Sequence, residues 1–308
     1  MNLAELKARP PWLTLKAPPP GTLERLQELF KALALHTICE GAACPNAGEC
    51  FAHRTATFLI LGDTCTRDCR FCNVPGGRPL PPDPAEPENL ARAVAALGLK
   101  HVVITSVTRD DLPDGGAGHF AACIAAIHRL CPETSVEVLV PDFKGDREAV
   151  RTVLAAGVSV FGHNVETVPS LYRKVRPGAD YRRSLAVLAL AKELNPTVLT
   201  KSGLMLGLGE TEAEVREVLH DLKAAGCDIL TIGQYLQPSP KHLPIVRYVQ
   251  PEEFARWEKE GYALGFAFVA SGPFVRSSYR AAEAAEAVRS LRAVPNEPSE
   301  GRGRPSAG

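Results

Sequence analysis

Three cysteines in one short segment have the residue type and spacing to hold an inorganic cluster. Cys65, Cys69 and Cys72 are separated by three and by two residues, so their thiolates can converge on one centre. A [4Fe–4S] cube has four irons, and three thiolates leave one iron free to bind a small molecule. Zinc is one alternative, although zinc ligands usually include Cys-x2-Cys or Cys/His pairs, and three ordinary thiols are the other. We therefore predict an iron–sulfur cluster whose vacant position is a reaction site.

A second group of three cysteines precedes the first. Cys39, Cys44 and Cys50 again supply three thiolates from one compact segment, which indicates a second iron–sulfur site. A zinc knuckle is the alternative for this segment, with His36 or His53 as a further ligand. No fourth cysteine or well-spaced histidine completes such a zinc set nearby. The cluster is therefore the preferred interpretation.

The other three of the nine cysteines are scattered through apolar stretches. Free cysteine is among the most buried residue types, so we expect Cys123, Cys131 and Cys227 to be structural thiols. In a reducing compartment, cysteines are interpreted as thiols or metal ligands before disulfides.

Composition limits the class of protein. The 308 residues include 35 basic and 35 acidic side chains, so the formal charge is zero and no bulk positive field attracts nucleic acid. Hydrophobic residues make up 45% and charged residues 23%, values that exclude wholesale disorder. No apolar run approaches the roughly 18 residues of a membrane span, and the start lacks a signal-peptide pattern. We expect a soluble, cytoplasmic protein without a nucleic-acid or membrane partner.

Repeated βα units are the structural elements that must position these residues. Apolar β-branched runs predict strands at 57–61, 101–107, 135–140, 159–165, 197–205, 228–236 and 266–270. Amphipathic runs between them predict helices at 86–97, 117–130, 146–156, 181–194, 211–225 and 251–264. Several helices are followed by the usual glycine stop, at Gly98, Gly157, Gly226 and Gly265. Such strands indicate an α/β fold with a parallel sheet, either a (β/α) barrel or an open doubly wound sheet.

Polar segments directly follow the predicted strands. In such folds the functional groups gather on the loops after the carboxyl ends of the strands. The segments in question are 65–72, 106–111, 141–143, 163–167, 207–210, 234–237 and 276–279. We therefore expect the functional site at this end of the sheet.

The cysteine segment resembles a known superfamily. The pattern Cys-x3-Cys-x-Phe-Cys after a first barrel strand is similar to that of the radical S-adenosylmethionine superfamily. Together with the upstream cysteine triplet and Arg276-Ser-Ser-Tyr279, it makes the chain closely resemble the lipoyl synthases over roughly residues 10–281. Further matching segments are Pro11–Leu13, Cys44–Asn46, Thr55–Thr57, Ser106–Gly116, His163–Thr167, Val175–Gly178, Lys201–Gly203 and Gly207–Thr211.

The resemblance implies a partial (β/α)6-type TIM barrel with an extension at each end. Residues 1–52 would form an N-terminal arm that binds the auxiliary cluster, and residues 53–272 the radical S-adenosylmethionine barrel. Residues 273–308 would form a C-terminal extension that ends in a mobile tail rich in Pro, Gly, Ser and charge.

The resemblance also implies the ligands of two [4Fe–4S] clusters. Cys65, Cys69 and Cys72 would hold the S-adenosylmethionine cluster, and Cys39, Cys44 and Cys50 the auxiliary one. The family places a serine oxygen from the Arg-Ser-Ser-Tyr motif on the auxiliary cluster, and we assign Ser278, with Ser277 as the second choice. Taken alone, the two serines would instead be read as a turn or N-cap for a helix from about residue 279.

The activity that the resemblance implies is the insertion of two sulfur atoms, at C6 and C8 of an octanoyl group on a lysine of a carrier protein. These carbons are unactivated, so side-chain acids and bases cannot remove their hydrogens. A radical from a cofactor is required, and no side chain is assigned a catalytic role. Two S-adenosylmethionine molecules would be used per product, with the auxiliary cluster consumed as sulfur donor.

Thr108, Asn164 and Glu166 are our candidates for binding S-adenosylmethionine, with Arg109 and Asp110 near them. Each lies after a predicted strand, where a turn former or a buried strand end is the alternative interpretation. Three further basic residues could hold polar parts of the substrate or cofactor, or could simply be solvated surface groups. They are Arg182, Lys201 and Arg276.

The implied partners are octanoylated lipoyl carrier proteins or domains and a ferredoxin or flavodoxin as electron donor, and we expect a monomer. The nearest alternative is another radical S-adenosylmethionine enzyme, such as a biotin-synthase-like sulfur inserter or a dehydrogenase. The upstream triplet and Arg276-Ser-Ser-Tyr279 argue against it. A zinc-stapled interaction module is the alternative without catalysis, and it predicts a colourless protein instead of a brown one.

Overall fold

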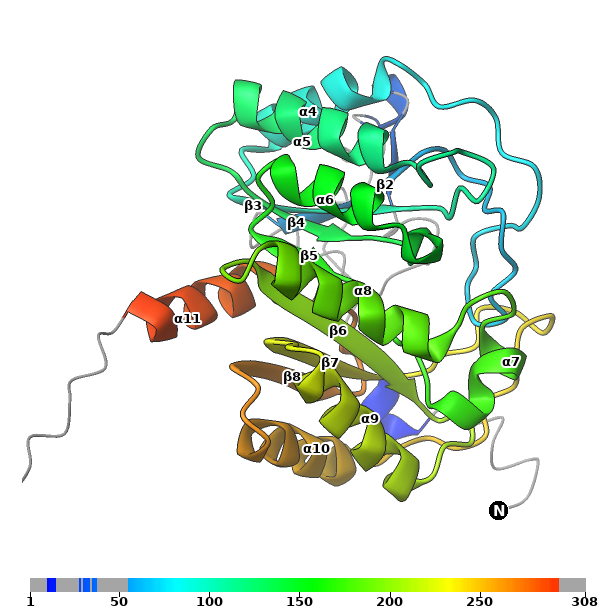
Figure 1. The fold of residues 1–308 in the computed structure, drawn as a ribbon. Helices are drawn as coiled ribbons and strands as arrows, with labels where there is room; N and C mark the ends of the chain where they lie inside the picture. The colour runs from blue at the N-terminus through cyan, green and yellow to red at the C-terminus, as the bar shows by residue number, and fades with distance from the viewer. Residues whose placement is uncertain (1–9, 15–27, 29, 34, 38–54, 294–308) are drawn as a thin grey trace, which may run out of the picture.

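The computed structural model describes residues 10–14, 28, 30–33, 35–37 and 55–293 (Figure 1). The predicted auxiliary ligands Cys39, Cys44 and Cys50, together with His53, lie outside the described residues. The same holds for the predicted C-terminal tail beyond residue 293.

Seven parallel strands follow one another in the sheet in the order of the chain. They are β2 (Thr55–Ile60), β3 (His101–Ser106), β4 (Ser135–Leu139), β5 (Val160–Gly162), β6 (Leu199–Leu206), β7 (Ile229–Gln234) and β8 (Phe268–Gly272). A short strand, β1 (His36–Thr37), pairs with β2 in the antiparallel sense. The strand order never reverses, whereas a doubly wound sheet has a switch point where it does. In the described residues β1 and β8 are the two edges of the sheet, so the barrel is partial.

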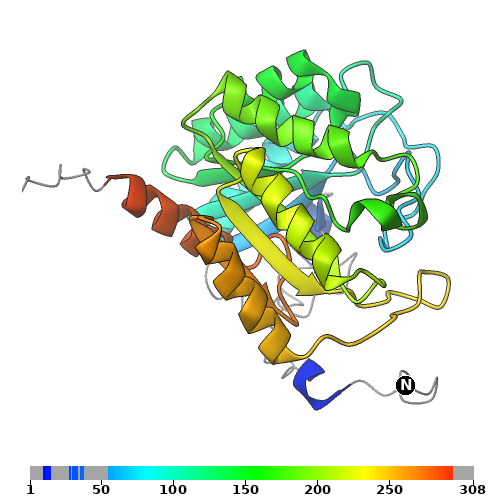
Figure 2. The same cartoon turned by 60° about the horizontal axis from the view of Figure 1, so that its bottom comes forward.

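Helices cross from each parallel strand to the next and cover the outer face of the sheet (Figures 1 and 2). They are α4 (Glu86–Leu97), α5 (Ala117–Leu130), α6 (Arg147–Ala155), α7 (Tyr172–Val175), α8 (Tyr181–Leu194), α9 (Glu212–Ala224) and α10 (Pro251–Ala263). A last helix, α11 (Ala281–Ala293), follows β8. Short 3-10 turns lie at η2 (Pro11–Leu13), η3 (Phe143–Gly145) and η4 (Pro169–Leu171). This arrangement confirms the predicted α/β fold of the partial-barrel type.

The predicted helices agree closely with the structure. Three of them, α4, α5 and α8, have the predicted bounds, and α6, α9 and α10 differ by one residue at one or both ends. The glycines that follow four helices all have positive φ, between 58° at Gly98 and 91° at Gly157. This left-handed conformation costs glycine least, which explains why glycine ends these helices. The four-residue helix α7 was not predicted, because one helical turn carries no periodic pattern.

The main hydrophobic core lies between the sheet and the outer helices. Val218, Leu219 and Leu222 on α9 pack against Leu204 and Leu230 of the sheet. Each such side chain contributes about 1.5–3 kcal/mol when it is fully buried. None of the helices in the described ranges combines the length and the apolar character that a membrane span requires.

Helix α11 closes the amino end of the barrel. Its residues Ala284, Ala285 and Val288 form one cluster with Val160 and Leu199, the first residues of β5 and β6. The helix lies at the amino ends of the strands in both views (Figures 1 and 2). The interior is therefore filled by apolar side chains at this end.

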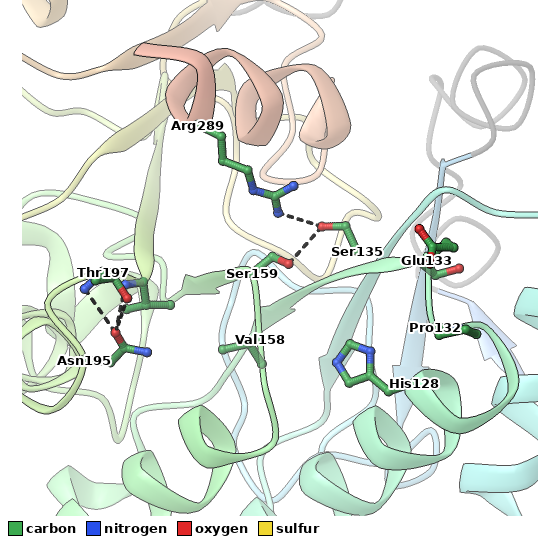
Figure 3. Close-up of a pocket in the computed structure, with 11 residues that line it drawn as sticks. His128, Pro132, Glu133, Ser135, Val158, Ser159, Asn195, Thr197 and Arg289 are labelled. Atoms are coloured by element: carbon green, nitrogen blue, oxygen red, sulfur yellow. Dashed lines mark hydrogen bonds between the residues drawn. The ribbon is translucent and has the colours of Figure 1, made fainter. Parts of the chain in front are cut away.

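A shallow pocket lies beside α11 at the amino ends of β4, β5 and β6 (Figure 3). Its polar groups bond to each other, because Arg289 donates to the Ser135 hydroxyl at 2.9 Å and Ser135 donates to Ser159 at 3.0 Å. Ligands of such folds bind at the carboxyl ends of the strands. We therefore place the functional site at the opposite end from this pocket.

Candidate cluster and cofactor site

The three-cysteine segment directly follows β2 and is closed into a loop by backbone hydrogen bonds. Cys65 donates to the carbonyl of Pro75 at 2.9 Å, and Gly77 donates to the carbonyl of Cys65 at 2.8 Å. Within the loop, the N–H of Cys72 donates to the carbonyl of Cys69 at 3.0 Å, which turns the chain back on itself. These bonds hold the three cysteines in one closed loop after the carboxyl end of β2.

Backbone N–H groups are directed at the sulfur of Cys65. Thr108 donates to this Sγ at 3.2 Å and Arg67 at 3.4 Å. Hydrogen bonds to cysteine sulfur favour the thiolate and tune iron–sulfur clusters. The environment of Cys65 therefore fits the ligand role predicted for it.

Burial disfavours the charged forms of the other two thiols. It raises the pKa of Cys69, where the Arg176 guanidinium opposes the shift. Burial raises the pKa of Cys72 to about 12, with the neighbouring thiols of Cys69 and Cys65 as further contributors. The three thiols therefore lie close enough to repel one another as thiolates. An iron cluster would supply positive charge that offsets this repulsion.

No group of three His, Cys, Asp or Glu side chains in the described part of the chain is arranged to hold a single metal ion. A cube makes a different demand, because each thiolate binds its own iron.

Arg67 ties the cysteine segment to two other strand ends. It donates to both carboxylate oxygens of Asp110, after β3, and to both of Asp142, after β4. Asp142 also accepts from Arg183 of α8 at 2.8 Å, and its side chain is fully buried. The guanidinium of Arg67 holds the pKa of Asp142 well below its usual range despite burial. The loop is thus fixed by charged groups that only the tertiary structure brings together.

Arg176 lies at the centre of the site and was not singled out as a site residue from the sequence. Its Nη1 donates to the carbonyl of Asn164 at 2.8 Å and to the hydroxyl of Tyr172 at 3.0 Å. The nearby Glu166 and Cys69 favour its charged form against burial. Its buried Nε has no hydrogen-bond partner in the described structure. The guanidinium therefore lies between a predicted cluster ligand and a predicted cofactor residue. The only sequence signal that could have identified Arg176 was its place in the Val-Arg-Pro-Gly segment.

Two of the three predicted cofactor residues meet inside the barrel. Asn164 donates from Nδ2 to Glu166 Oε1 at 3.1 Å, while its buried Oδ1 has no partner in the described structure. Burial raises the pKa of Glu166, and Arg176 opposes the shift. Thr108 joins the same region through its backbone, which donates to Cys65 and accepts from Thr66. Its side chain has no bond to Asn164 or Glu166 in the described structure.

The backbone around Glu166 is shaped for this role. Glu166 has a φ of 66°, an unusual conformation for a residue other than glycine, and such strain collects at functional sites. Gly203 on β6 permits close packing beside it, since a Cβ there would lie 2.3 Å from Thr231 Oγ1 and 3.3 Å from Asn164 Oδ1. The unpaired amide oxygen of Asn164 and the carboxylate of Glu166 together form a small polar cradle that fits a polar ligand.

Other basic and acidic residues near the predicted cofactor site have structural partners. Arg109 is buried and donates to Asp111 and to the carbonyl of Leu61. Asp110 pairs with Arg67, as described above. These contacts favour the turn-forming interpretation of both residues.

Lys201 is not a surface group, so that alternative was wrong. Its side chain is 2% exposed and its Nζ bonds to Glu137 Oε1 at 2.7 Å inside the barrel. Arg182, in contrast, is exposed on α8. Arg276 donates to the carbonyl of Val275 at 2.8 Å.

The segment that holds Ser278 crosses the carboxyl end of β7. A Cβ on Gly233 would lie 2.1 Å from the carbonyl oxygen of Val275, so only glycine permits this crossing. Ser278 follows in a half-buried turn, and α11 begins at Ala281 instead of near 279. The predicted cysteine partners of Ser278 lie outside the described residues, so its role as a ligand stays a prediction.

Comparison with known proteins identifies the superfamily from the barrel. A model described as the radical S-adenosylmethionine superfamily matches residues 59–222. The fold is similar to methylornithine synthase, with a TM-score of 0.52 and 13% identity over 80% of this chain and 81% of that one. It is also similar to Streptococcus suis SuiB bound to its precursor peptide SuiA, with a TM-score of 0.56 and 12% identity over 84% of this chain and 55% of that one.

Whole-chain relatives identify the family. A lipoyl synthase of Caldanaerobacter subterraneus subsp. tengcongensis is 58% identical, over 89% of this chain and 95% of the relative. The lipoyl synthase of Methylococcus capsulatus is 59% identical, over 91% of this chain and 87% of the relative. That of Thiobacillus denitrificans is 55% identical over 92% of both chains. With a match of this extent added to the radical S-adenosylmethionine barrel, the chain belongs to the lipoyl synthase family.

Proposed function

We propose that this enzyme inserts sulfur at C6 and C8 of an octanoyl group carried on a protein lysine, as a sulfurtransferase that uses two S-adenosylmethionine molecules per product. The single observation that supports this most directly is the position of the three-cysteine loop next to the polar cradle of Asn164 and Glu166. A cluster on the loop and a ligand in the cradle would be neighbours, because Arg176 lies beside both Cys69 and Glu166.

Two [4Fe–4S] clusters fit the donor set. Cys65, Cys69 and Cys72 would hold the first, which with S-adenosylmethionine supplies a radical able to remove hydrogen from an unactivated carbon. The second would be held by Cys39, Cys44, Cys50 and Ser278 and would supply the sulfur atoms. The Ser278 hydroxyl is a harder donor than thiolate, so its bond to iron would be the weakest of the four.

The side chains of the barrel bind and orient the cofactor. Glu166 and the Oδ1 atom of Asn164 can accept hydrogen bonds from ammonium or hydroxyl groups of S-adenosylmethionine. Arg176 keeps positive charge beside them and can donate from its unpaired Nε. Binding in this geometry would hold the reacting groups in the correct orientation relative to one another before the reaction begins.

The barrel also keeps water away from the reacting groups. Helix α11 and the Val160–Leu199 cluster fill its amino end, and Lys201 and Glu137 pair in the interior. A dry, fixed environment prevents side reactions of a radical. No described side chain needs to exchange a proton with the substrate. The residues of the chain therefore contribute by binding the cofactor and substrate, orienting them and excluding water.

The proposed partners follow from this activity. The substrate is an octanoylated lipoyl carrier protein or domain, and the reductant is a ferredoxin or flavodoxin type of protein. We further propose that the enzyme works as a cytoplasmic monomer.

The test is the content of iron and acid-labile sulfide in anaerobically reconstituted protein, measured for the natural chain and for the Cys39→Ala/Cys44→Ala/Cys50→Ala variant. We expect about eight irons per chain in the first and about four in the second. About four in both would mean that the upstream triplet holds no cluster and that the proposed sulfur source is wrong.

The same preparations test the activity. With dithionite, S-adenosylmethionine and octanoylated carrier, the natural chain should form lipoyl product and 5′-deoxyadenosine. The triple variant should form 5′-deoxyadenosine without lipoyl product. Lipoyl product from the variant would contradict the assignment of the auxiliary cluster.

A further inference from the structure

Exposed basic residues of the chain are of two kinds. Some pair with acids, as in Arg147 with Glu193 and Arg216 with Glu260, and others form no described ion pair. Several exposed basic residues near the cysteine segment form no ion pair with any acid that the structure describes, and four of them lie on three segments that meet there. These four, which we term the basic rim, are Arg70, Arg173, Lys174 and Lys241.

Backbone hydrogen bonds join the three segments of the basic rim. Arg70 donates to the carbonyl of Val175, the last residue of α7, at 2.9 Å. Leu243, in the loop after β7, donates to the carbonyl of Arg70 at 3.1 Å. Both views show these segments together at the carboxyl end of the sheet (Figures 1 and 2). Asp68 is also exposed in the cysteine segment, so the rim with its neighbouring acid has a surplus of positive charge.

The basic rim lies directly outside the predicted cluster ligands. Arg70 is exposed between Cys69 and Cys72, which are both partly buried. On the same side, His242 Nε2 bonds to the carbonyl of Cys72 at 2.9 Å, and His242 is the neighbour of Lys241. A protein seated on the rim would be separated from the ligand cysteines only by this loop.

We propose that the basic rim is the docking surface for an acidic one-electron donor protein that reduces the cluster of Cys65, Cys69 and Cys72. This inference rests on the proposed function, because it requires that cluster. In the step, the donor loses one electron and the cluster gains it, and no bond forms or breaks between the two proteins.

The position of the rim favours an electron donor over the octanoylated carrier. An electron crosses a thin layer of protein without an open channel, so a donor needs only to lie against the outer side of the loop. The octanoyl chain must instead enter the barrel to reach the region of Asn164 and Glu166. The basic rim lies on the outer side of this loop, where the electron donor would bind. Arg70 belongs to the cysteine loop, and Lys241 is the neighbour of His242, which bonds to the carbonyl of Cys72.

The charge of the rim has a kinetic consequence. Complementary charge steers the encounter of two proteins and chiefly raises the association rate, and added salt screens it. Reduction by an acidic donor should therefore slow as ionic strength rises. Reduction by dithionite, which needs no docking surface, should not depend on these residues.

The experiment compares two double variants with equal changes in charge. Lys174→Glu/Lys241→Glu brings the summed charge of the basic rim to zero. Lys100→Glu/Lys259→Glu makes the same change in charge at two exposed lysines, before β3 and on α10, that also form no described ion pair. Reduced flavodoxin is mixed with each reconstituted protein in a stopped-flow instrument, and bleaching of the cluster absorbance is followed at two salt concentrations. We expect at least a tenfold slower second-order rate for the rim variant at low salt, with a weaker salt dependence. The control variant should stay within about twofold of the natural chain.

Two outcomes would overturn the proposal. Equal rates of reduction by flavodoxin in the rim and control variants would show that the rim does not dock the donor. A raised KM for octanoylated carrier in the dithionite-driven reaction of the rim variant, with donor rates unchanged, would assign the rim to the carrier. Failure of the proposed function is recognised separately, because the natural chain would then form no lipoyl product even with dithionite.

Discussion

Arg67 and Asp142 are joined by two hydrogen bonds, from Nη1 to Oδ2 at 3.0 Å and from Nη2 to Oδ1 at 2.7 Å. The arginine belongs to the cysteine loop and the aspartate follows β4, so 75 positions of sequence separate them. The same guanidinium donates a second pair of hydrogen bonds, from Nε and Nη2, to the carboxylate of Asp110. This one side chain thus fixes the cysteine loop relative to two strands of the barrel.

Removing Arg67 should destabilise the protein and loosen the cluster loop. We expect Arg67→Met to lower the free energy of unfolding by about 3 kcal/mol, because it leaves the buried carboxylate of Asp142 with incomplete partners. Arg151→Met is the matched control, since the Arg151–Glu148 pair is exposed and should contribute less than about 1 kcal/mol. Urea unfolding and the iron retained after reconstitution are the two measurements. Equal losses in the two variants would contradict the role assigned to Arg67.

His163 should make stability depend on pH in the acidic range. Burial lowers its pKa to about 4, with Arg176 and Arg67 as further causes, and Asp142 and the bond to the Val140 carbonyl oppose the shift. In the unfolded chain a histidine titrates near about 6.5, so between these values the unfolded state binds more protons and stability rises with pH. The loss on acidification from about 6.5 to about 4 should reach about 3 kcal/mol.

The check is urea unfolding of His163→Gln as a function of pH. In this variant the free energy of unfolding should depend less steeply on pH, by the equivalent of about one proton over the same range. His220→Gln, on the exposed side of α9, is the control and should keep the natural slope. An unchanged slope in His163→Gln would show that His163 is not the group responsible.

Arg176 should raise the reduction potential of the cluster on Cys65, Cys69 and Cys72. A buried positive charge beside Cys69 stabilises the more negative, reduced state. Arg176→Met should lower the midpoint potential by about 100 mV, the equivalent of roughly 2 kcal/mol for a charge a few ångströms away. An electron paramagnetic resonance titration measures this, with exposed Arg173→Met as the control. A shift of the same size in both variants would rule out a local effect of Arg176.

Glu166 should contribute to binding of S-adenosylmethionine through its charge. Glu166→Gln keeps the size of the side chain and removes one charged acceptor, so we expect about tenfold weaker binding, or roughly 1.4 kcal/mol. Equilibrium dialysis with labelled cofactor on reconstituted protein measures the Kd. Glu133→Gln, in the pocket beside α11, is the control and should bind as the natural chain does. Unchanged affinity in Glu166→Gln would remove this residue from the cofactor site.

Local sequence signals were sufficient for most of the fold. The bounds of α4, α5 and α8 follow from helical periodicity and from glycine at a fixed stop, and the parallel strands follow from continuous apolar runs. These signals depend on neighbours within a few residues. The bounds of β5 differ, because only Val160–Gly162 of the predicted 159–165 pairs as a strand. After Gly162 the chain still bonds to β6 at His163 and Glu166, but the positive φ of Glu166 interrupts the regular strand.

The sequence by itself determined which cysteines could bind a cluster. The tertiary structure decided which charged groups surround those cysteines. Cys65, Cys69 and Cys72 are close in the chain, so their spacing alone predicts a shared cluster. Asp142 follows β4 and Arg176 follows α7, and nothing local relates these charged groups to the cysteines. Their roles arise only when the parallel strands bring all the carboxyl ends to one edge, where burial strengthens each charge interaction.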